Sequence, residues 1–202
     1  MGLRQARKVA ARHPFLLVGG ALALVAVALQ AGGAGVREAL AYQRAGVAAG
    51  ELWRLLSGHL VHLGWSHLAY NLAGLVLIGW LVGRAFDARR WAGIVATSII
   101  AINIGFWVLN PELAWYVGLS GVLHGVLAGG VLAGVLAGHR EAFVLAVIIA
   151  GKLAWEQWAG PVPGSEAASG GPVIVYAHLY GAVGGFLGAV ALRRRVAPRA
   201  SI

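Results

Sequence analysis

Cysteine is absent from this 202-residue sequence, and aspartate occurs only once, as Asp87. The absence of cysteine excludes disulfides, thiolate nucleophiles and cysteine-based metal sites. Charge is also scarce, because 11% of the residues are charged against about 25% in a typical soluble domain. Hydrophobic residues instead make up 59% of the chain. This balance predicts a membrane protein with room for about six spans of roughly 20 residues each.

The formal net charge of +9 comes from arginine and lysine residues that lie in short clusters between apolar segments. Such clusters are typical of membrane topology signals rather than of a nucleic-acid-binding face, so no nucleic-acid partner is expected. If the N-terminus is cytoplasmic, twelve of these cations face the cytoplasm and three face the other side, with Lys152 inside a span. The positive-inside rule therefore predicts that both termini are cytoplasmic.

Six apolar segments are predicted to cross the membrane as one domain. They are residues 14–31, 66–82, 91–109, 116–138, 142–158 and 173–192. Residues 51–65 mix charge and histidine with apolar residues and are predicted to form an interfacial loop helix. The basic ends, 1–13 and 193–202, are predicted to be cytoplasmic. We therefore expect an all-α membrane protein with six transmembrane helices, and a cleaved signal peptide is an open alternative for the first segment.

A serine and a histidine stand near the starts of two apolar segments that are predicted to enter the membrane from the same side. Ser120 lies in YVGLSGVLHG and His178 in YAHLYG. At about 1.5 Å rise per residue, both are expected roughly 10 Å below the outer surface, where polar side chains mark functional sites. Histidine is the usual base for a serine nucleophile. Because Asp87 is predicted on the opposite side of the membrane, a Ser–His dyad is expected in place of a Ser–His–Asp triad.

Donors for an oxyanion are predicted beside this pair. His67 and Asn71 are four residues apart and therefore share one helix face. Both side chains can donate hydrogen bonds, as can the backbone N–H groups of Leu119 and Ser120. These four groups are candidates for an oxyanion hole.

Glycines recur at intervals of four on the fourth and sixth segments. The fourth segment holds Gly121, Gly125 and Gly129, and the sixth holds Gly181 and Gly185. Such stripes allow two helices to approach closely, which is expected to bring the serine and the histidine within hydrogen-bonding reach. The same stripes can also serve between chains, so the oligomeric state stays open.

Together, these residues resemble the rhomboid intramembrane serine proteases. The resemblance covers roughly residues 50–192 and is carried by four motifs: ELWR at 51–54, HLAYN at 67–71, GLSG at 118–121 and AHLYGAVGG at 177–185. It implies a rhomboid fold in which Ser120 is the nucleophile and His178 the general base. It also implies that His67 and Asn71 line the oxyanion hole, that the substrates are membrane-anchored proteins in the lipid bilayer, and that no cofactor is needed.

His124 departs from the ordinary rhomboid pattern, which has an aromatic residue four positions after the serine. The GLSGVLHG motif, the compact length and the WEQ sequence at 155–157 resemble the rhombosortase branch instead. That branch implies a bacterial inner-membrane protease whose site opens to the periplasmic side. Its substrates are exported proteins that end in a glycine-rich motif, an apolar helix and a basic tail. Three roles are open for His124: stacking on His178, tuning its proton affinity, or acting as an alternative base.

Other polar residues have less specific interpretations. Lys152 and Glu156 are four residues apart, so they form an internal ion pair or Glu156 contributes to the side where substrate enters. No metal is predicted, because the histidines lack a carboxylate or thiolate at convincing ligand spacing. His59 is expected to be solvated at the interface, and His62 to brace the loop.

Three functions compete at this point. The first is a peptidase for the sorting signals described above, and the second is a general rhomboid protease of other single-span proteins. The third is a rhomboid-like protein that binds membrane helices without cutting them. A transporter is disfavoured, because the polar groups gather in the outer half of the membrane rather than along a full path across it.

Overall fold

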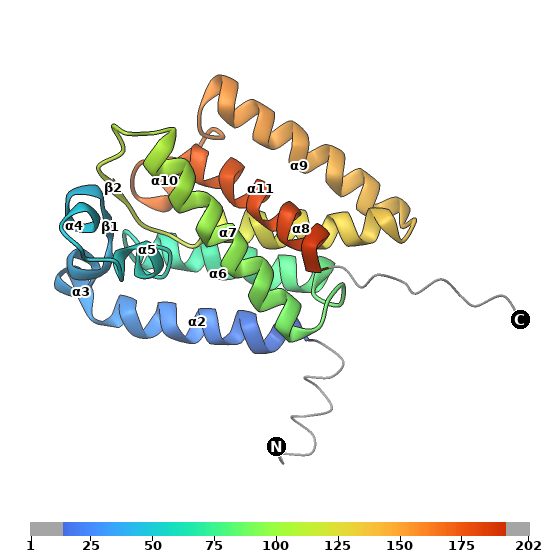
Figure 1. Cartoon of the computed structure of the whole chain (residues 1–202), viewed down its shortest axis with the longest axis horizontal. Coiled ribbons are helices and arrows are strands. Elements are labelled where there is room, and N and C mark those ends of the chain that lie inside the picture. Colours follow the sequence, from blue (N-terminus) through green and yellow to red (C-terminus); the bar gives the residue numbers. More distant parts are fainter. Residues whose placement is uncertain (1–13, 193–202) are drawn as a thin grey trace, which may run out of the picture.

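The computed structural model describes residues 14–192, and the predicted cytoplasmic ends 1–13 and 193–202 lie outside the described residues. The chain is mostly helical in this range (Figure 1). The helices are α2 (Phe15–Ala31), α3 (Gly33–Leu40), α4 (Arg44–Ala48), α5 (Arg54–Ser57), α6 (Trp65–Val82), α7 (Ala88–Val108), α8 (Ser120–Leu136), α9 (Arg140–Ala159), α10 (Ser165–Ser169) and α11 (Val175–Leu192). The strands β1 (Tyr42–Gln43) and β2 (Trp115–Tyr116) pair antiparallel.

Each of the six predicted apolar segments contains a long helix. Within the described residues, four helices are long and apolar enough to cross a membrane: α6, α7, α9 and α11. Helices α2 and α3 qualify only as a pair that bends by 120°, and α8 is apolar but has only 17 residues. The architecture is therefore that of a helical multi-pass membrane protein with four candidate spans, or up to five if the bent pair is counted as one.

Helix α8 lies in the core of the bundle and packs against α7 and α11. Glycine makes this contact close: a methyl group at Gly121 would lie 2.8 Å from the carbonyl oxygen of Ala177, and one at Gly129 would lie 3.0 Å from that of Gly185. Backbone thus touches backbone along α8 and α11, with no side chain between them. This packing fixes the distance between the first turns of the two helices.

Helices α2 and α9 lie at opposite edges of the bundle (Figure 1). Of the four candidate spans, α9 is the least buried within the protein, with 17% of its residues covered. It faces lipid on most of its circumference, through residues such as Phe143, Val147 and Ile148. The side of α9 that faces inward carries the fully buried Glu156.

Two predicted helices differ from the structure. The segment predicted to be helical from residue 116 begins its helix at Ser120, because Gly118 has a φ of +123° that no right-handed helix contains. The predicted interfacial helix over 51–65 is only one short turn, α5. Buried Arg54 shapes this segment instead: it pairs with Glu51 and donates to the carbonyl oxygen of Ala41 at 2.8 Å. Side chain-to-backbone bonds of this kind stabilise an irregular loop.

The expectation that His59 is solvated is wrong, because the structure buries both loop histidines. His59 contacts the amide of Asn103 at 3.3 Å and His62 packs edge-on against His67, with ring centroids 5.0 Å apart. Within residues 14–192, neither ring nitrogen of His62 has a hydrogen-bond partner. Burial lowers the pKa of His62 to about 3, with a further contribution from His67, and lowers that of His59 to about 4.

These shifts predict that the fold loses stability in acid. An unfolded histidine has a pKa of about 6.5, so below that pH the unfolded chain binds protons that the folded chain does not. Stability is therefore fully present above pH 6.5 and falls by up to about 1.4 kcal/mol per pH unit for each histidine as the pH drops. We expect His62→Phe to remove the contribution of one histidine from the dependence of stability on pH. The measurement is thermal unfolding in detergent between pH 7.5 and 4.5.

The matched control is His139→Phe, which changes an exposed histidine before α9. It is expected to keep the wild-type dependence of the melting temperature on pH. Equal slopes for wild type and His62→Phe would contradict the assignment of the acid sensitivity to His62.

Candidate active site

Ser120 is the first residue of α8, directly after a tight extended turn. The hydroxyl of Tyr116 donates to the carbonyl oxygen of Gly118 at 2.6 Å, and the N–H of Gly118 donates to the carbonyl oxygen of Gly58 at 3.0 Å. The positive φ of Gly118 then turns the chain into the helix. At this position, the N–H of Ser120 has no partner within its own helix and is free to bind an anion.

His178 lies in the first turn of α11 and reaches Ser120 across the α8–α11 contact. Its Nε2 is 3.0 Å from Ser120 Oγ, and its side chain is 6% exposed. The two residues are 58 positions apart in the chain. The packing that brings them together therefore creates a nucleophile–base geometry.

Glu156 of α9 contacts the other nitrogen of His178. Its Oε2 is 2.9 Å from His178 Nδ1, and its Oε1 is 2.6 Å from the ammonium of Lys152. The carboxylate is 2% exposed, whereas the Lys152 side chain is 36% exposed. The expected ion pair between Lys152 and Glu156 is present, and its carboxylate also binds the histidine.

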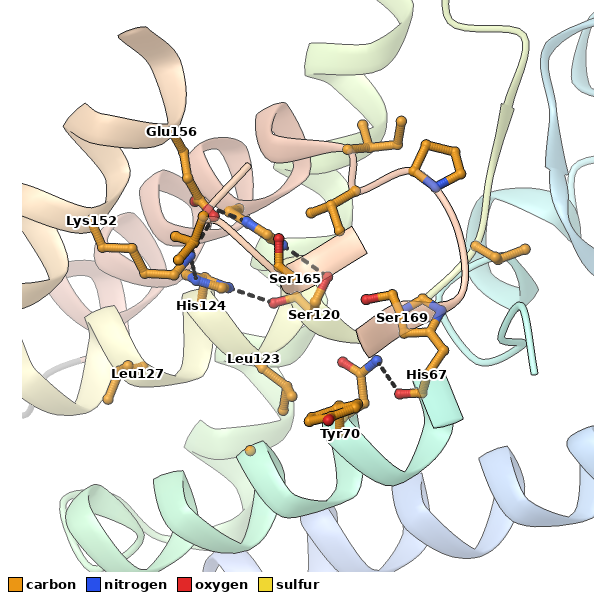
Figure 2. A pocket seen from close by; sticks show the side chains of 18 of the residues that line it. His67, Tyr70, Ser120, Leu123, His124, Leu127, Lys152, Glu156, Ser165 and Ser169 are labelled. Carbon is orange, nitrogen blue, oxygen red and sulfur yellow. Dashed lines mark hydrogen bonds and ion pairs between the residues drawn. The ribbon is translucent and has the colours of Figure 1, made fainter. Parts of the chain in front are cut away.

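His124 completes this set of contacts. Its ring stacks on that of His178, with centroids 4.1 Å apart and an angle of 17° between the planes. Its Nε2 lies 2.9 Å from Lys152 Nζ, and its Nδ1 lies 2.8 Å from the carbonyl oxygen of Ser120. Hydrogen bonds therefore run in a closed ring from the Ser120 hydroxyl through four side chains and back to the Ser120 carbonyl (Figure 2).

The chemistry of the donors fixes the direction of every bond in this ring. An ammonium only donates, so Lys152 donates to both Glu156 and His124 Nε2. His124 then carries its proton on Nδ1 and donates to the Ser120 carbonyl. A carboxylate only accepts, so His178 donates from Nδ1 and its Nε2 accepts the hydroxyl proton of Ser120. This is the tautomer that a general base requires.

His67 and Asn71 lie on α6. His67 is on the opposite side of Ser120 from His124 and Lys152 (Figure 2). The backbone N–H of Leu63 donates to His67 Nδ1 at 3.4 Å, which leaves the proton of the imidazole on Nε2. Asn71 Nδ2 donates one hydrogen to the His67 carbonyl at 3.0 Å. The imidazole also packs on Gly118, where a methyl group would lie 2.7 Å from Cε1. His67 and Asn71 line the same cavity as Ser120.

A cavity of about 270 Å³ contains these groups. Helices α6, α8, α9 and α11, the end of β2 and the segment around α10 line it, through His67, Tyr70, Asn71, Gly74, Ile78, Tyr116, Val117, Ser120, Leu123, His124, Leu127, Lys152, Glu156, Val162, Ser165, Ser169, Pro172, Val173, Ile174 and His178. Most of this lining is apolar, and the polar groups converge on Ser120, as is typical of substrate sites.

The contact between Glu156 and His178 is not predicted from the sequence. Asp87, the only aspartate, caps the N-terminus of α7 by accepting from the N–H of Arg90 at 3.0 Å. The expectation that the histidines lack a carboxylate partner is wrong. His124, Glu156 and His178 each offer a ligand atom within 4.8 Å of the others, which is a spacing that a metal ion can use.

Comparison with known protein families gives the context for this geometry. The model of the Rhomboid domain matches residues 49–195, which include all of the groups above. The chain belongs to the rhomboid family. No solved structure matches the chain significantly.

Curated rhomboid proteins are similar over parts of the chain. A putative rhomboid protease of Bacillus subtilis, YdcA, is 34% identical over 90 residues, which cover 45% of each chain. The rhomboid protease GluP of the same organism is 35% identical over 81 residues, which are 40% of this chain and 16% of GluP. The rhomboid protease GlpG of Haemophilus influenzae is 33% identical over 78 residues, or 38% of this chain and 39% of GlpG. The matched segments thus span less than half of each relative.

Proposed function

We propose that this rhomboid is an intramembrane serine endopeptidase with Ser120 as nucleophile and His178 as general base. The observation that carries the proposal is the 3.0 Å contact between Ser120 Oγ and His178 Nε2, in a chain that is similar to the rhomboid proteases GluP and GlpG. A hydroxyl this close to an imidazole lone pair can transfer its proton as it attacks a carbonyl carbon.

The reaction has two steps. Ser120 Oγ bonds to the scissile carbonyl carbon while its proton moves to His178 Nε2, and the carbonyl electrons form an oxyanion. The oxyanion collapses, the C–N bond breaks, and the proton passes from Nε2 to the leaving amine. Water then attacks the acyl-enzyme in the same way and restores the Ser120 hydroxyl.

The oxyanion is proposed to bind donors on both sides of the serine. His67 Nε2 and the second amide hydrogen of Asn71 would donate from α6, and the N–H groups of Leu119 and Ser120 from the start of α8. The extended turn at Gly118 supports this assignment, because it directs the first amides of α8 at the cavity.

His124 is proposed to support the base rather than replace it. Both of its ring nitrogens have other partners, whereas its ring face covers that of His178. Stacking holds the His178 imidazole in one plane, so that Nε2 stays directed at Ser120 throughout the reaction.

Substrate is proposed to enter from the lipid, between α6 and α9. The cavity is lined from both helices, and its deeper walls are apolar, with Ile78 on α6 and Leu127 on α8. A transmembrane helix that unwinds at its outer end could place a peptide bond at Ser120 without carrying charge through the bilayer. Six spans with both termini in the cytoplasm of a bacterial inner membrane would open this site to the periplasm.

The proposed substrates are exported proteins whose C-terminal sorting signal has a glycine-rich motif, an apolar helix and a basic tail. His124 and the WEQ sequence at 155–157 favour this rhombosortase-type specificity. General cleavage of other single-span proteins is the second candidate, and helix binding without cleavage is the third.

Reconstitution into liposomes tests these alternatives. A single-span reporter with a glycine-rich motif, an apolar helix and a basic tail is incubated with the protein, and the products are identified by mass spectrometry. We expect cleavage within or beside the glycine-rich motif. A reporter that has the same helix and tail but a Ser/Thr/Gln-rich motif should be cut at least about tenfold more slowly. Equal rates would favour the general protease, and binding of both reporters without products would favour the helix-binding protein.

A further inference from the structure

The ion pair of Lys152 and Glu156 lies where charge is most costly. At about 1.5 Å per residue, Lys152 is roughly 10 Å from the outer end of α9, and Glu156 is 3% exposed. Ionisable residues within a transmembrane helix are expensive and mark functional sites. An ion pair needed only for folding would not have to touch the base, whereas Glu156 contacts His178 Nδ1 at 2.9 Å.

The ammonium of Lys152 also lies beside a set of residues that could hold a metal ion. Two imidazoles and one carboxylate form a ligand set within 4.8 Å, and Lys152 Nζ contacts two of its three members, at 2.6 Å from Glu156 and 2.9 Å from His124. A lysine in this position supplies the positive charge that the carboxylate requires and blocks coordination of a metal.

Removing the lysine would therefore change more than one contact. Without the ammonium, Glu156 would be a buried carboxylate whose Oε1 has lost its donor. The contact that holds its Oε2 against His178 Nδ1 would then be less firmly fixed. The lone pair of His124 Nε2 would also lose its donor, so the tautomer that binds the Ser120 carbonyl would no longer be enforced.

We propose that Glu156 and Lys152 are positioning residues for the hydrolytic step, with Lys152 acting as a built-in cation in a place that would otherwise bind a metal ion. Glu156 holds the Nδ1–H of His178 and so directs Nε2 at Ser120. Lys152 holds the Glu156 carboxylate in place and fixes His124. The catalytic part of this proposal rests on the proposed peptidase function, whereas the part that concerns the cation position does not.

Steady-state kinetics on the reporter tests the positioning roles. Glu156→Gln and Lys152→Met are each expected to lower kcat by about 10²-fold or more, with KM within about threefold of wild type. The double variant should lose no more than the worse single variant, because residues that act as one unit are not additive. Lys152→Arg, which keeps a donor-only cation, should retain most of the activity.

Controls separate these effects from loss of fold. Glu141→Gln removes an exposed carboxylate from the other end of α9 and should leave kcat unchanged. Folded Glu156→Gln and Lys152→Met proteins with wild-type kcat would overturn the positioning roles. So would losses that multiply in the double variant, since independent contacts would then be responsible.

Zinc binding tests the cation position without any need for activity. Wild type and Lys152→Ala are equilibrated with micromolar ZnCl₂ in detergent, passed through a desalting column, and assayed for metal per chain. We expect Lys152→Ala to retain about one zinc per chain, wild type to retain none, and Lys152→Ala with Glu156→Gln to lose it again. Equal zinc in wild type and Lys152→Ala would overturn the idea that the ammonium occupies this position.

The two experiments also distinguish failure of this proposal from failure of the proposed function. A wild-type protein that cuts no reporter, but gains zinc only when Lys152 is replaced, would refute the peptidase and leave the cation position intact. Active wild type with unaffected Glu156 and Lys152 variants would refute the positioning roles and leave the peptidase function intact.

Discussion

Replacing Ser120 with alanine is expected to abolish covalent labelling by a fluorophosphonate probe and to lower peptidase activity by about 10⁴-fold or more. The probe reacts only with a serine whose proton a base can accept, and in this structure the base is His178 at 3.0 Å. His178→Ala should therefore reduce labelling by a similar factor, although the nucleophile remains. The double variant should be no worse than Ser120→Ala, because the two residues act as one unit.

The measurement is the rate constant for labelling of purified protein in detergent, followed by gel fluorescence. Ser66→Ala serves as the matched control, since Ser66 is exposed on α6 and has no contact with the ring of hydrogen bonds. Labelling that persists in Ser120→Ala would show that another serine is the nucleophile. A wild-type protein that stays unlabelled while it binds the reporter would favour the helix-binding function.

The sequence is sufficient to predict that these two residues meet. Ser120 and His178 each stand near the start of an apolar segment with glycine at intervals of four, and helices with such stripes approach until their backbones touch. Two stripes in register leave few alternative positions for Ser120, directly before Gly121, and for His178, three residues before Gly181. The spacing of His67 and Asn71 places them on one face of α6 by the same periodicity.

The contact between Glu156 and His178 could not be predicted in this way. After its first turn, helix α9 is apolar apart from Lys152, Glu156 and Gln157, so no hydrophobic stripe indicates which face turns inward. The spacing of these two residues predicts only that they meet each other. The rotation of α9 about its axis is determined by its packing on α8, and that rotation brings Glu156 to the base.

The start of α8 shows a second limit of the sequence. The sequence is apolar without interruption from Tyr116 into the helix, so it predicts a span that begins at residue 116. A buried extended segment is as apolar as a buried helix, and only the conformation of Gly118 separates the two. Because residues 116–119 are not helical, Ser120 is the first residue of α8, where backbone N–H groups have no partner within the helix. This position matters more for the chemistry of Ser120 than its depth in the membrane does.

Replacing Gly185 with leucine is expected to disrupt the α8–α11 contact and to remove activity without touching the site. A Cβ atom on Gly185 would overlap the backbone of Gly125, and the backbone cannot move aside as a flexible side chain can. Overpacking of this kind costs about 1–3 kcal/mol for small insertions and more for a whole side chain. Because the same contact sets the distance from His178 to Ser120, a shift of 1 Å would already cost about 10²-fold in rate.

Graded substitutions test this link between packing and catalysis. Gly185→Ala should lower both the melting temperature in detergent and the fluorophosphonate labelling rate, and Gly185→Leu should lower them further. Gly20→Ala is the matched control, because a methyl group at Gly20 on α2 has no atom within 4 Å, and alanine is the better helix former. A Gly185→Ala protein with wild-type stability and labelling would mean that α8 and α11 can separate without cost. The distance between serine and histidine would then have to be maintained by the ring of Glu156, Lys152 and His124 rather than by the helix contact.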